Sequence, residues 1–105
     1  MKLLEMLNIT KKIIGKELDF DWSRIRSKNC YYSKWIECDG EMYRLLKSYN
    51  TVVGIQNNHN GFWELGKYSR TTSKQVTDFV NDNALVRYFV PVTNFDKSNT
   101  LKVFS

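Results

Sequence analysis

The chain has 105 residues, of which 42% are hydrophobic and 26% charged, a composition typical of one folded domain and not of a disordered chain. Sixteen Lys and Arg against 11 Asp and Glu give a net charge of +5, which favours an anionic partner such as nucleic acid. No run of about 20 apolar residues occurs, so we predict no membrane segment and no membrane partner, and we expect a cytoplasmic protein. We predict that residues 1–105 form a single domain.

The first predicted element is a helix over residues 2–16. Leu4, Leu7 and Ile14 contribute to an apolar face at helical spacing, and Gly15 is a stop signal. Several lysines crowd its last turn, where cations interact favourably with the helix dipole. Residues 17–30 follow, and their pattern does not decide between a loop and the start of another helix.

Residues 31–46 are predicted to form a β-hairpin. Aromatic-rich, roughly alternating runs flank Asp39-Gly40, a pair that suits a type I′ turn because both of its central positions need positive φ. A two-residue turn places Trp35 opposite Arg44, where the guanidinium can stack on the indole ring.

A second hairpin with the same turn chemistry is predicted at Asn60-Gly61, between strands at 51–56 and 62–65. Since consecutive antiparallel strands usually pair as neighbours, these runs form a β-meander.

A second helix is predicted near 71–83, with Thr72 and Gln75 as a capping box and an apolar stripe on one face. Residues 84–92 can add a strand, which Pro91 confines to an edge or a strand end. The predicted fold class is therefore α+β: an antiparallel β-meander of about four to five strands with an N-terminal helix and a second helix near 71–83.

The sequence contains no recognisable catalytic or metal-binding motif. His59 is the only histidine, and its neighbours predict an exposed turn. Cys30 and Cys38 are placed on one extended strand, which separates them too far for a disulfide. Two cysteines and one histidine are too few for a four-ligand zinc site. We therefore expect no enzymatic activity, no metal and no cofactor.

Residues 22–35 interleave basic and aromatic side chains without an acidic residue. Basic groups contact phosphates and aromatic faces stack on bases, so this mixture suits a nucleic-acid surface. The alternative is that the aromatic side chains alternate into the core while the basic ones are solvated. The candidate contact residues are Arg24, Arg26, Lys28, Lys34 and Trp35.

Residues 67–74 place hydroxyls and cations at the predicted start of the second helix. Free backbone N–H groups and the positive end of the helix dipole converge there, which favours an anion site. The alternative is ordinary capping. We expect Arg70→Glu with Lys74→Glu to impair function without unfolding the chain. The candidate residues are Tyr68, Arg70, Thr71, Thr72 and Lys74.

The sequences SYNTVVG at 48–54 and YSRTTSKQ at 68–75 resemble a pattern in small proteins from phages, prophages and plasmids of Gram-positive bacteria. In that family, S-Y-x-T-x-V precedes Y-S-x-T-T-S-K or -R, usually followed by His, where this chain has Gln75. The resemblance spans about 30 residues, from Ser48 to Val80. The family is largely of unknown function, and some similar proteins are anti-CRISPR proteins that act on Cas9-type effectors.

The resemblance implies a protein of a mobile element in a bacterial host, and together with the missing catalytic motif it favours a non-enzymatic, cytoplasmic binding protein. Our leading hypothesis is an anti-CRISPR inhibitor of a type II (Cas9) effector, which binds the effector protein or its guide RNA directly. The alternative is a nucleic-acid-binding regulatory domain of a phage or plasmid, with DNA or RNA as its partner.

Overall fold

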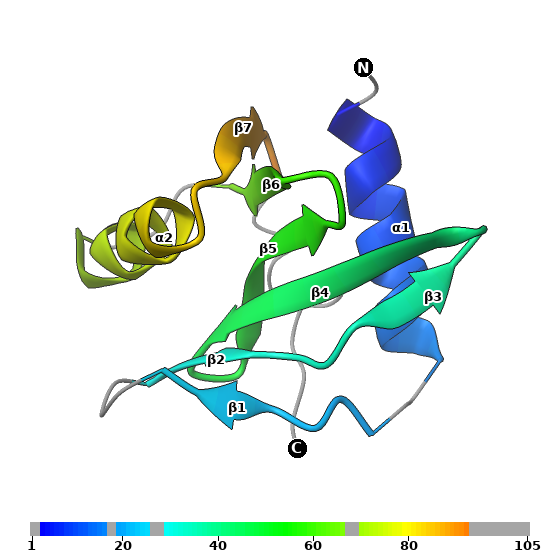
Figure 1. Ribbon diagram of the computed structural model, residues 1–105, viewed down its shortest axis with the longest axis horizontal. Helices are drawn as coiled ribbons and strands as arrows, with labels where there is room; N and C mark the ends of the chain where they lie inside the picture. Colours follow the sequence, from blue (N-terminus) through cyan, green and yellow to red (C-terminus); the bar gives the residue numbers. More distant parts are fainter. Residues whose placement is uncertain (1–2, 17–18, 26–28, 67–69, 93–105) are drawn as a thin grey trace.

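The computed structural model of the chain describes residues 3–16, 19–25, 29–66 and 70–92. It contains two helices, α1 (Leu3–Gly15) and α2 (Arg70–Asp82), and one seven-stranded sheet (Figure 1). The α+β class and both predicted helices are confirmed. The strands are β1 (Ser23–Arg24), β2 (Cys30–Tyr32), β3 (Ile36–Cys38), β4 (Glu41–Ser48), β5 (Thr51–Asn57), β6 (Gly61–Leu65) and β7 (Val86–Val90).

The strands pair in the order β1-β2-β4-β5-β6-β7, and β3 also pairs with β4. The meander of β4, β5 and β6 is antiparallel, as predicted. Strand β7 instead runs parallel to β6, because α2 connects the two strands as a crossover. Pro91 directly follows β7, the last strand in the pairing order, which agrees with its predicted place at a strand end.

The sheet has more strands than the predicted four to five, partly because the run over residues 31–38 is interrupted. Ser33 is buried, and its hydroxyl accepts a hydrogen bond from the Leu45 N–H at 2.9 Å. The residues before and after this point become β2 and β3, which pair with different parts of β4, and the short β1 adds a further strand. Cys30 and Cys38 therefore lie on two strands and not on one; both are buried, and neither is part of a disulfide bond.

The hairpin at Asp39-Gly40 is confirmed. Asp39 has φ 53° and Gly40 has φ 85°, the positive values that the predicted turn requires. The guanidinium carbon of Arg44 lies 4.9 Å from the centroid of the Trp35 ring, as the predicted pairing implied.

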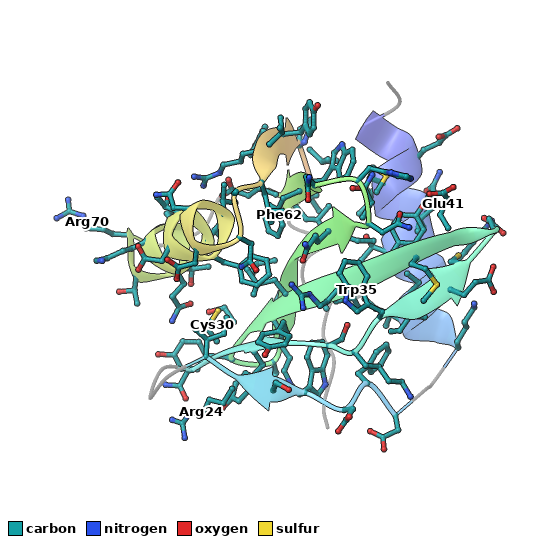
Figure 2. The ribbon with its side chains drawn as sticks, in the orientation of Figure 1. Arg24, Cys30, Trp35, Glu41, Phe62 and Arg70 are labelled. Atoms are coloured by element: carbon teal, nitrogen blue, oxygen red, sulfur yellow. The ribbon has the colours of Figure 1, made fainter. Side chains whose placement is uncertain are left out.

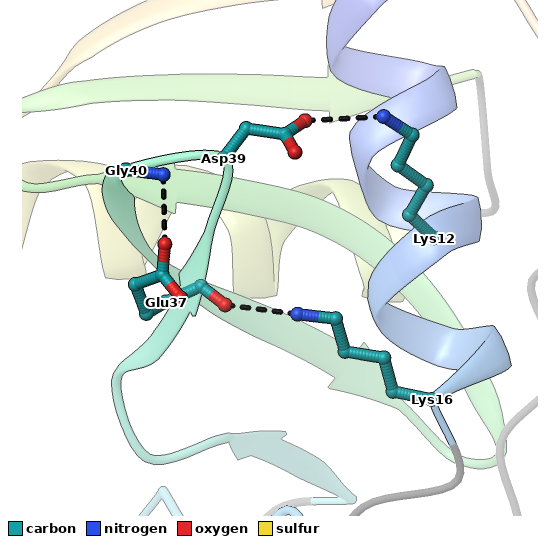
Figure 3. Close-up of polar contacts among 5 residues, drawn as sticks. All are labelled: Lys12, Lys16, Glu37, Asp39 and Gly40. Atoms are coloured by element: carbon teal, nitrogen blue, oxygen red, sulfur yellow. Dashed lines mark hydrogen bonds and ion pairs between the residues drawn. The ribbon is translucent and has the colours of Figure 1, made fainter.

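Helix α1 is attached to this hairpin by Lys12 in its last turn and by Lys16 directly after its end (Figure 3). Lys12 Nζ lies 3.1 Å from Asp39 Oδ2, and this hydrogen bond and the aspartate charge raise the pKa of Lys12. Lys16 Nζ donates to the Glu37 carbonyl at 3.0 Å. Both contacts are exposed, so they orient the helix more than they stabilise it.

The second turn differs from the prediction. It spans residues 58–60, and only Asn60 has a positive φ, of 65°, whereas Gly61 already begins β6. The Asn57 side-chain oxygen accepts hydrogen bonds from the N–H groups of His59 and Gly61, at 3.0 Å and 2.8 Å. This side chain organises a longer loop than a two-residue turn.

The two helices lie apart with β5 and β6 between them in Figure 1, and each packs on its own core cluster. Side chains alternate along β4, so Leu45 packs in the cluster of α1 and Leu46 in the cluster of α2. We call these two sides of the sheet the α1 face and the α2 face.

Strands β6 and β7 are joined to α2 by Arg87. Its Nη2 lies 2.6 Å from Glu64 Oε1, and its Nη1 donates to the Thr77 hydroxyl at 2.9 Å.

Glu64 is buried, so Arg87→Ala leaves a buried carboxylate without this partner. We expect the free energy of unfolding, measured in urea, to fall by about 2 kcal/mol, less than for a fully buried pair because Arg87 is partly exposed. A loss below about 0.5 kcal/mol would contradict this role.

Candidate nucleic-acid interface

An open groove of about 460 Å³ lies where β1, β2 and the turn between β4 and β5 meet. Antiparallel pairing brings the three segments together: Arg24 is opposite Tyr31, and Tyr31 is opposite Lys47. We call it the aromatic groove. Its lining residues are Trp22, Arg24, Asn29, Tyr31, Lys47, Tyr49 and Asn50.

Lys47 brings a positive charge to the base of the groove. Its side chain is only 3% exposed, because the ammonium lies between two aromatic rings. Nζ is 4.3 Å from the centroid of the Trp22 ring and 5.0 Å from that of the Tyr31 ring, which are favourable cation–π distances. Burial lowers the pKa of Lys47 from its usual value.

Tyr49 stands at the rim of the groove with an exposed ring. It is 59% exposed, the largest value among the exposed large hydrophobic side chains of the described residues. Its φ is 55°, a value that bulky residues rarely adopt, and its N–H donates to the Asn29 carbonyl at 2.9 Å. Unfavourable backbone geometry of this kind clusters at functional sites. An exposed aromatic ring is thus held at the groove at a cost to stability.

The chemistry of the groove suits an anionic ligand with flat apolar parts. Among the described residues that line it, two are cations, three are aromatic, two are amides, and none is a carboxylate. Cations attract phosphates, aromatic faces stack on bases, and amides form hydrogen bonds with base edges or sugars.

The burial of Lys47 also predicts a pH dependence of stability. Because its pKa is lowered on folding, the charged form is less favourable in the folded chain than in the unfolded chain. This cost is fully present below the lowered pKa and is relieved as the pH rises toward the unfolded value of 10.5. We therefore expect the free energy of unfolding of the native protein to rise relative to that of Lys47→Met between about pH 7 and about pH 10. Urea unfolding of both proteins measures this difference, and a difference that falls over this range would contradict it.

Of the candidate residues in the stretch 22–35, Arg24 lines the aromatic groove. Lys34 and Trp35 are exposed but do not line it, and the Trp35 ring contacts Arg44 instead. Arg26 and Lys28 lie outside the described residues. Tyr32 packs against the core cluster of α2, and Trp35 is exposed beside Arg44. Trp22 and Tyr31 line the groove.

Of the candidate residues at the start of α2, Arg70, Thr71, Thr72 and Lys74 do not line the groove. Arg70 and Arg24 lie at separate places in Figure 2, on α2 and β1. Thr71 is exposed, and Lys74 Nζ lies 3.4 Å from Asp78 Oδ2. Tyr68 lies outside the described residues.

Thr72 and Gln75 do not have the predicted roles in a capping box. Helix α2 begins at Arg70, so both residues are already inside it. The Ser48 hydroxyl lies 3.2 Å from the Thr72 hydroxyl and donates to Gln75 Oε1 at 2.9 Å. All three side chains are buried, so the segments at 48–54 and 68–75 supply side chains that join β4 to α2.

Lys47, Tyr49 and Asn50 are groove residues that the sequence analysis missed. The available signal was the pair Tyr49-Asn50 between two strand-like runs, because an aromatic residue in a tight turn has no core to enter.

The described residues contain neither a metal-ligand cluster nor a membrane-spanning helix. Residues 3–16, 19–25, 29–66 and 70–92 contain no group of three or more His, Cys, Asp or Glu side chains that could hold a metal ion. In the same ranges, no helix has the length and apolar character needed to cross a bilayer. His59 is exposed in its turn, as predicted, and its Nε2 lies 3.3 Å from Glu41 Oε1.

The fold and the groove together define a small α+β domain with an open, basic and aromatic groove at one end of its sheet. The chain belongs to a family of unknown function, DUF8033, whose model matches residues 1–97. No curated protein and no solved structure gives a significant match to it.

Proposed function

We propose that this protein binds single-stranded RNA or DNA through the aromatic groove, without catalysing a reaction. The observation that carries the proposal is Tyr49, an exposed ring in a positive-φ turn beside Lys47, Trp22 and Tyr31. A turn that had only to connect two strands would favour glycine or asparagine at that position.

In the proposed complex, a base stacks on the exposed ring of Tyr49 and a neighbouring base lies against the half-buried ring of Tyr31. Arg24 at the rim and the Lys47 charge at the base of the groove attract the phosphates. Stacking of this kind needs bases whose faces are accessible, which a duplex does not offer. The proposal therefore specifies a single strand.

Fluorescence anisotropy of labelled single-stranded and duplex oligonucleotides, titrated at several salt concentrations, tests the proposal. We expect tighter binding of the single strand and a linear fall of log K with log salt, with a slope of about −0.7 for each phosphate contacted. Arg24→Ala should make the slope less steep by about 0.7, the contribution of one phosphate contact. Lys34→Ala removes an exposed cation outside the groove and is the matched control. The absence of binding at low salt, or equal effects of the two variants, would contradict the proposal.

The resemblance of residues 48–75 to phage proteins supports a narrower second proposal: the protein inhibits a type II CRISPR effector by gripping its guide RNA. An RNA-binding groove is compatible with that role, whereas a net charge of +5 does not suit an acidic mimic of DNA. The test is plasmid interference in cells with a Cas9 system, with and without this gene. Unchanged interference across several Cas9 orthologues would rule this role out and leave strand binding open.

A further inference from the structure

A second concavity lies on the α2 face, between α2 and the strands β2 and β4. It has a volume of about 160 Å³. Ile25, Tyr32 and Phe79 supply apolar walls, and Arg44, Asp78 and Asp82 supply charge. Tyr31 and Tyr32 are neighbours on β2 and point to opposite faces, so this cavity and the aromatic groove lie on opposite sides of the sheet.

The size of the cavity limits what it can hold. An apolar cavity of about 150 Å³ in a protein interior takes one benzene molecule, and pockets for drug-sized ligands begin at about 300 Å³. The cavity on the α2 face is therefore large enough for one flat ring system whose edge reaches the opening.

The charges in the cavity restrict the ligand further. The Arg44 guanidinium lies 4.7 Å from the Tyr32 ring centroid and 5.6 Å from that of Phe79, and Nε donates to Gln56 Oε1 at 3.0 Å. This fixed cation disfavours a cationic ligand. Asp78, whose Oδ2 lies 3.4 Å from Lys74 Nζ, and Asp82 stand one helical turn apart on α2, and two carboxylates at the cavity disfavour an anionic ligand. A neutral ligand with polar edges avoids both repulsions.

Hydrogen-bonding groups of both kinds line the cavity. Carboxylates accept hydrogen bonds, and those of Asp78 and Asp82 suit ring N–H and amino groups. Gln75 uses its oxygen to accept from Ser48, so its NH₂ group is the donor that it can offer to a ring acceptor. Phe79 and Ile25 present apolar surface to the cavity, which suits the faces of a planar ring.

We propose that this cavity binds a neutral planar heterocycle with donors and acceptors on its edge, the chemical class of a nucleobase. The ring lies against the apolar walls of Phe79 and Ile25, and its edge faces the carboxylates of α2. This proposal goes beyond the proposed strand binding. Because the two sites are separate, the test of one can fail while the test of the other succeeds.

Titration of the full chain with guanosine, adenosine, cytidine and uridine, followed by ¹H–¹⁵N NMR, tests the proposal. We expect at least one nucleoside to shift the amide signals of Ile25, Tyr32 and Asn83, which surround the cavity. The 5′-monophosphate of that nucleoside should bind more weakly at this site, because its phosphate meets the carboxylates. Signal changes confined to Tyr31 and Tyr49, or none with any of the four, would overturn the proposal.

Two variants complete the test. Ile25→Phe fills the cavity from a half-buried position, and we expect it to weaken nucleoside binding at least about 10-fold. Asp78→Asn keeps the shape of the side chain and removes its charge. The difference in affinity between the nucleoside and its monophosphate should therefore become smaller. Lys34→Ala, an exposed position that lines neither the cavity nor the groove, is the control and should change neither. Nucleoside affinity that is unchanged in a folded Ile25→Phe protein would overturn the proposal.

Discussion

Replacement of Tyr49 by alanine is expected to weaken the binding of a single-stranded oligonucleotide about 5- to 150-fold. The range corresponds to the loss of one base–aromatic stack, which contributes about 1–3 kcal/mol. Tyr49 is 59% exposed, so the change removes little packing and the fold should persist. Fluorescence anisotropy at low salt measures the affinity, and circular dichroism checks the fold.

Three further variants separate stacking from other effects. Tyr49→Phe retains the ring and should retain binding, whereas Tyr49→Gly removes the ring but relieves the positive φ of 55°. Tyr49→Gly should therefore lose binding while the free energy of unfolding rises by about 1 kcal/mol. Phe89→Ala removes an exposed ring on β7, away from the groove, and should leave affinity unchanged. Full affinity in Tyr49→Ala, or an equal loss in Phe89→Ala, would contradict the assignment.

Gly54→Ala is expected to lower the free energy of unfolding by about 3 kcal/mol, near the upper end of the cost of overpacking a core. A Cβ atom on Gly54 would lie 2.1 Å from Cζ of Phe62, whose side chain is fully buried against α2. The ring cannot move away without displacing its neighbours, among them Phe79, whose ring centroid is 5.7 Å away. Urea unfolding followed by circular dichroism measures the loss.

The chain offers a matched control for this prediction. A Cβ atom on Gly15, at the end of α1, would meet nothing within 4 Å, so Gly15→Ala should not destabilise the protein. Adding Phe62→Leu to Gly54→Ala makes room for the new methyl group, and the double variant should lose less than the sum of the two single losses. The prediction is contradicted if the two single losses add strictly, or if Gly54→Ala leaves the free energy of unfolding unchanged. Either result would show that the close contact between residue 54 and Phe62 does not limit the packing.

Much of the fold could be predicted because local chemistry dictates it. The Asp39-Gly40 turn needs two positive φ values, and the helices at both ends of the meander follow from apolar spacing and stop signals. The break between β2 and β3 could not be predicted, since Ser33 interrupts the run through a hydrogen bond to Leu45, 12 residues away. The parallel pairing of β7 depends equally on where α2 packs.

The candidate site was only partly predictable for a similar reason. Of the candidate residues in the stretch 22–35, Arg24 lines the groove, and the lining residues Trp22, Asn29 and Tyr31 belong to the same stretch but were not among the candidates. Lys47 joins them only through the pairing of β2 with β4, and local patterning gives no sign that a lysine is buried between two rings. Ser48, Thr72 and Gln75, by contrast, make contacts that join β4 to α2 and lie outside the groove.

Photo-crosslinking tests the central claim, that the aromatic groove binds a single strand, most directly. A short RNA containing 4-thiouridine is irradiated with the full chain at low salt, and the modified peptides are identified by mass spectrometry. We expect crosslinks at Tyr49, Tyr31 or Trp22, and their loss when an excess of unlabelled single strand competes. Crosslinks at Trp35 or Tyr88 instead, or no specific crosslink at all, would contradict the account.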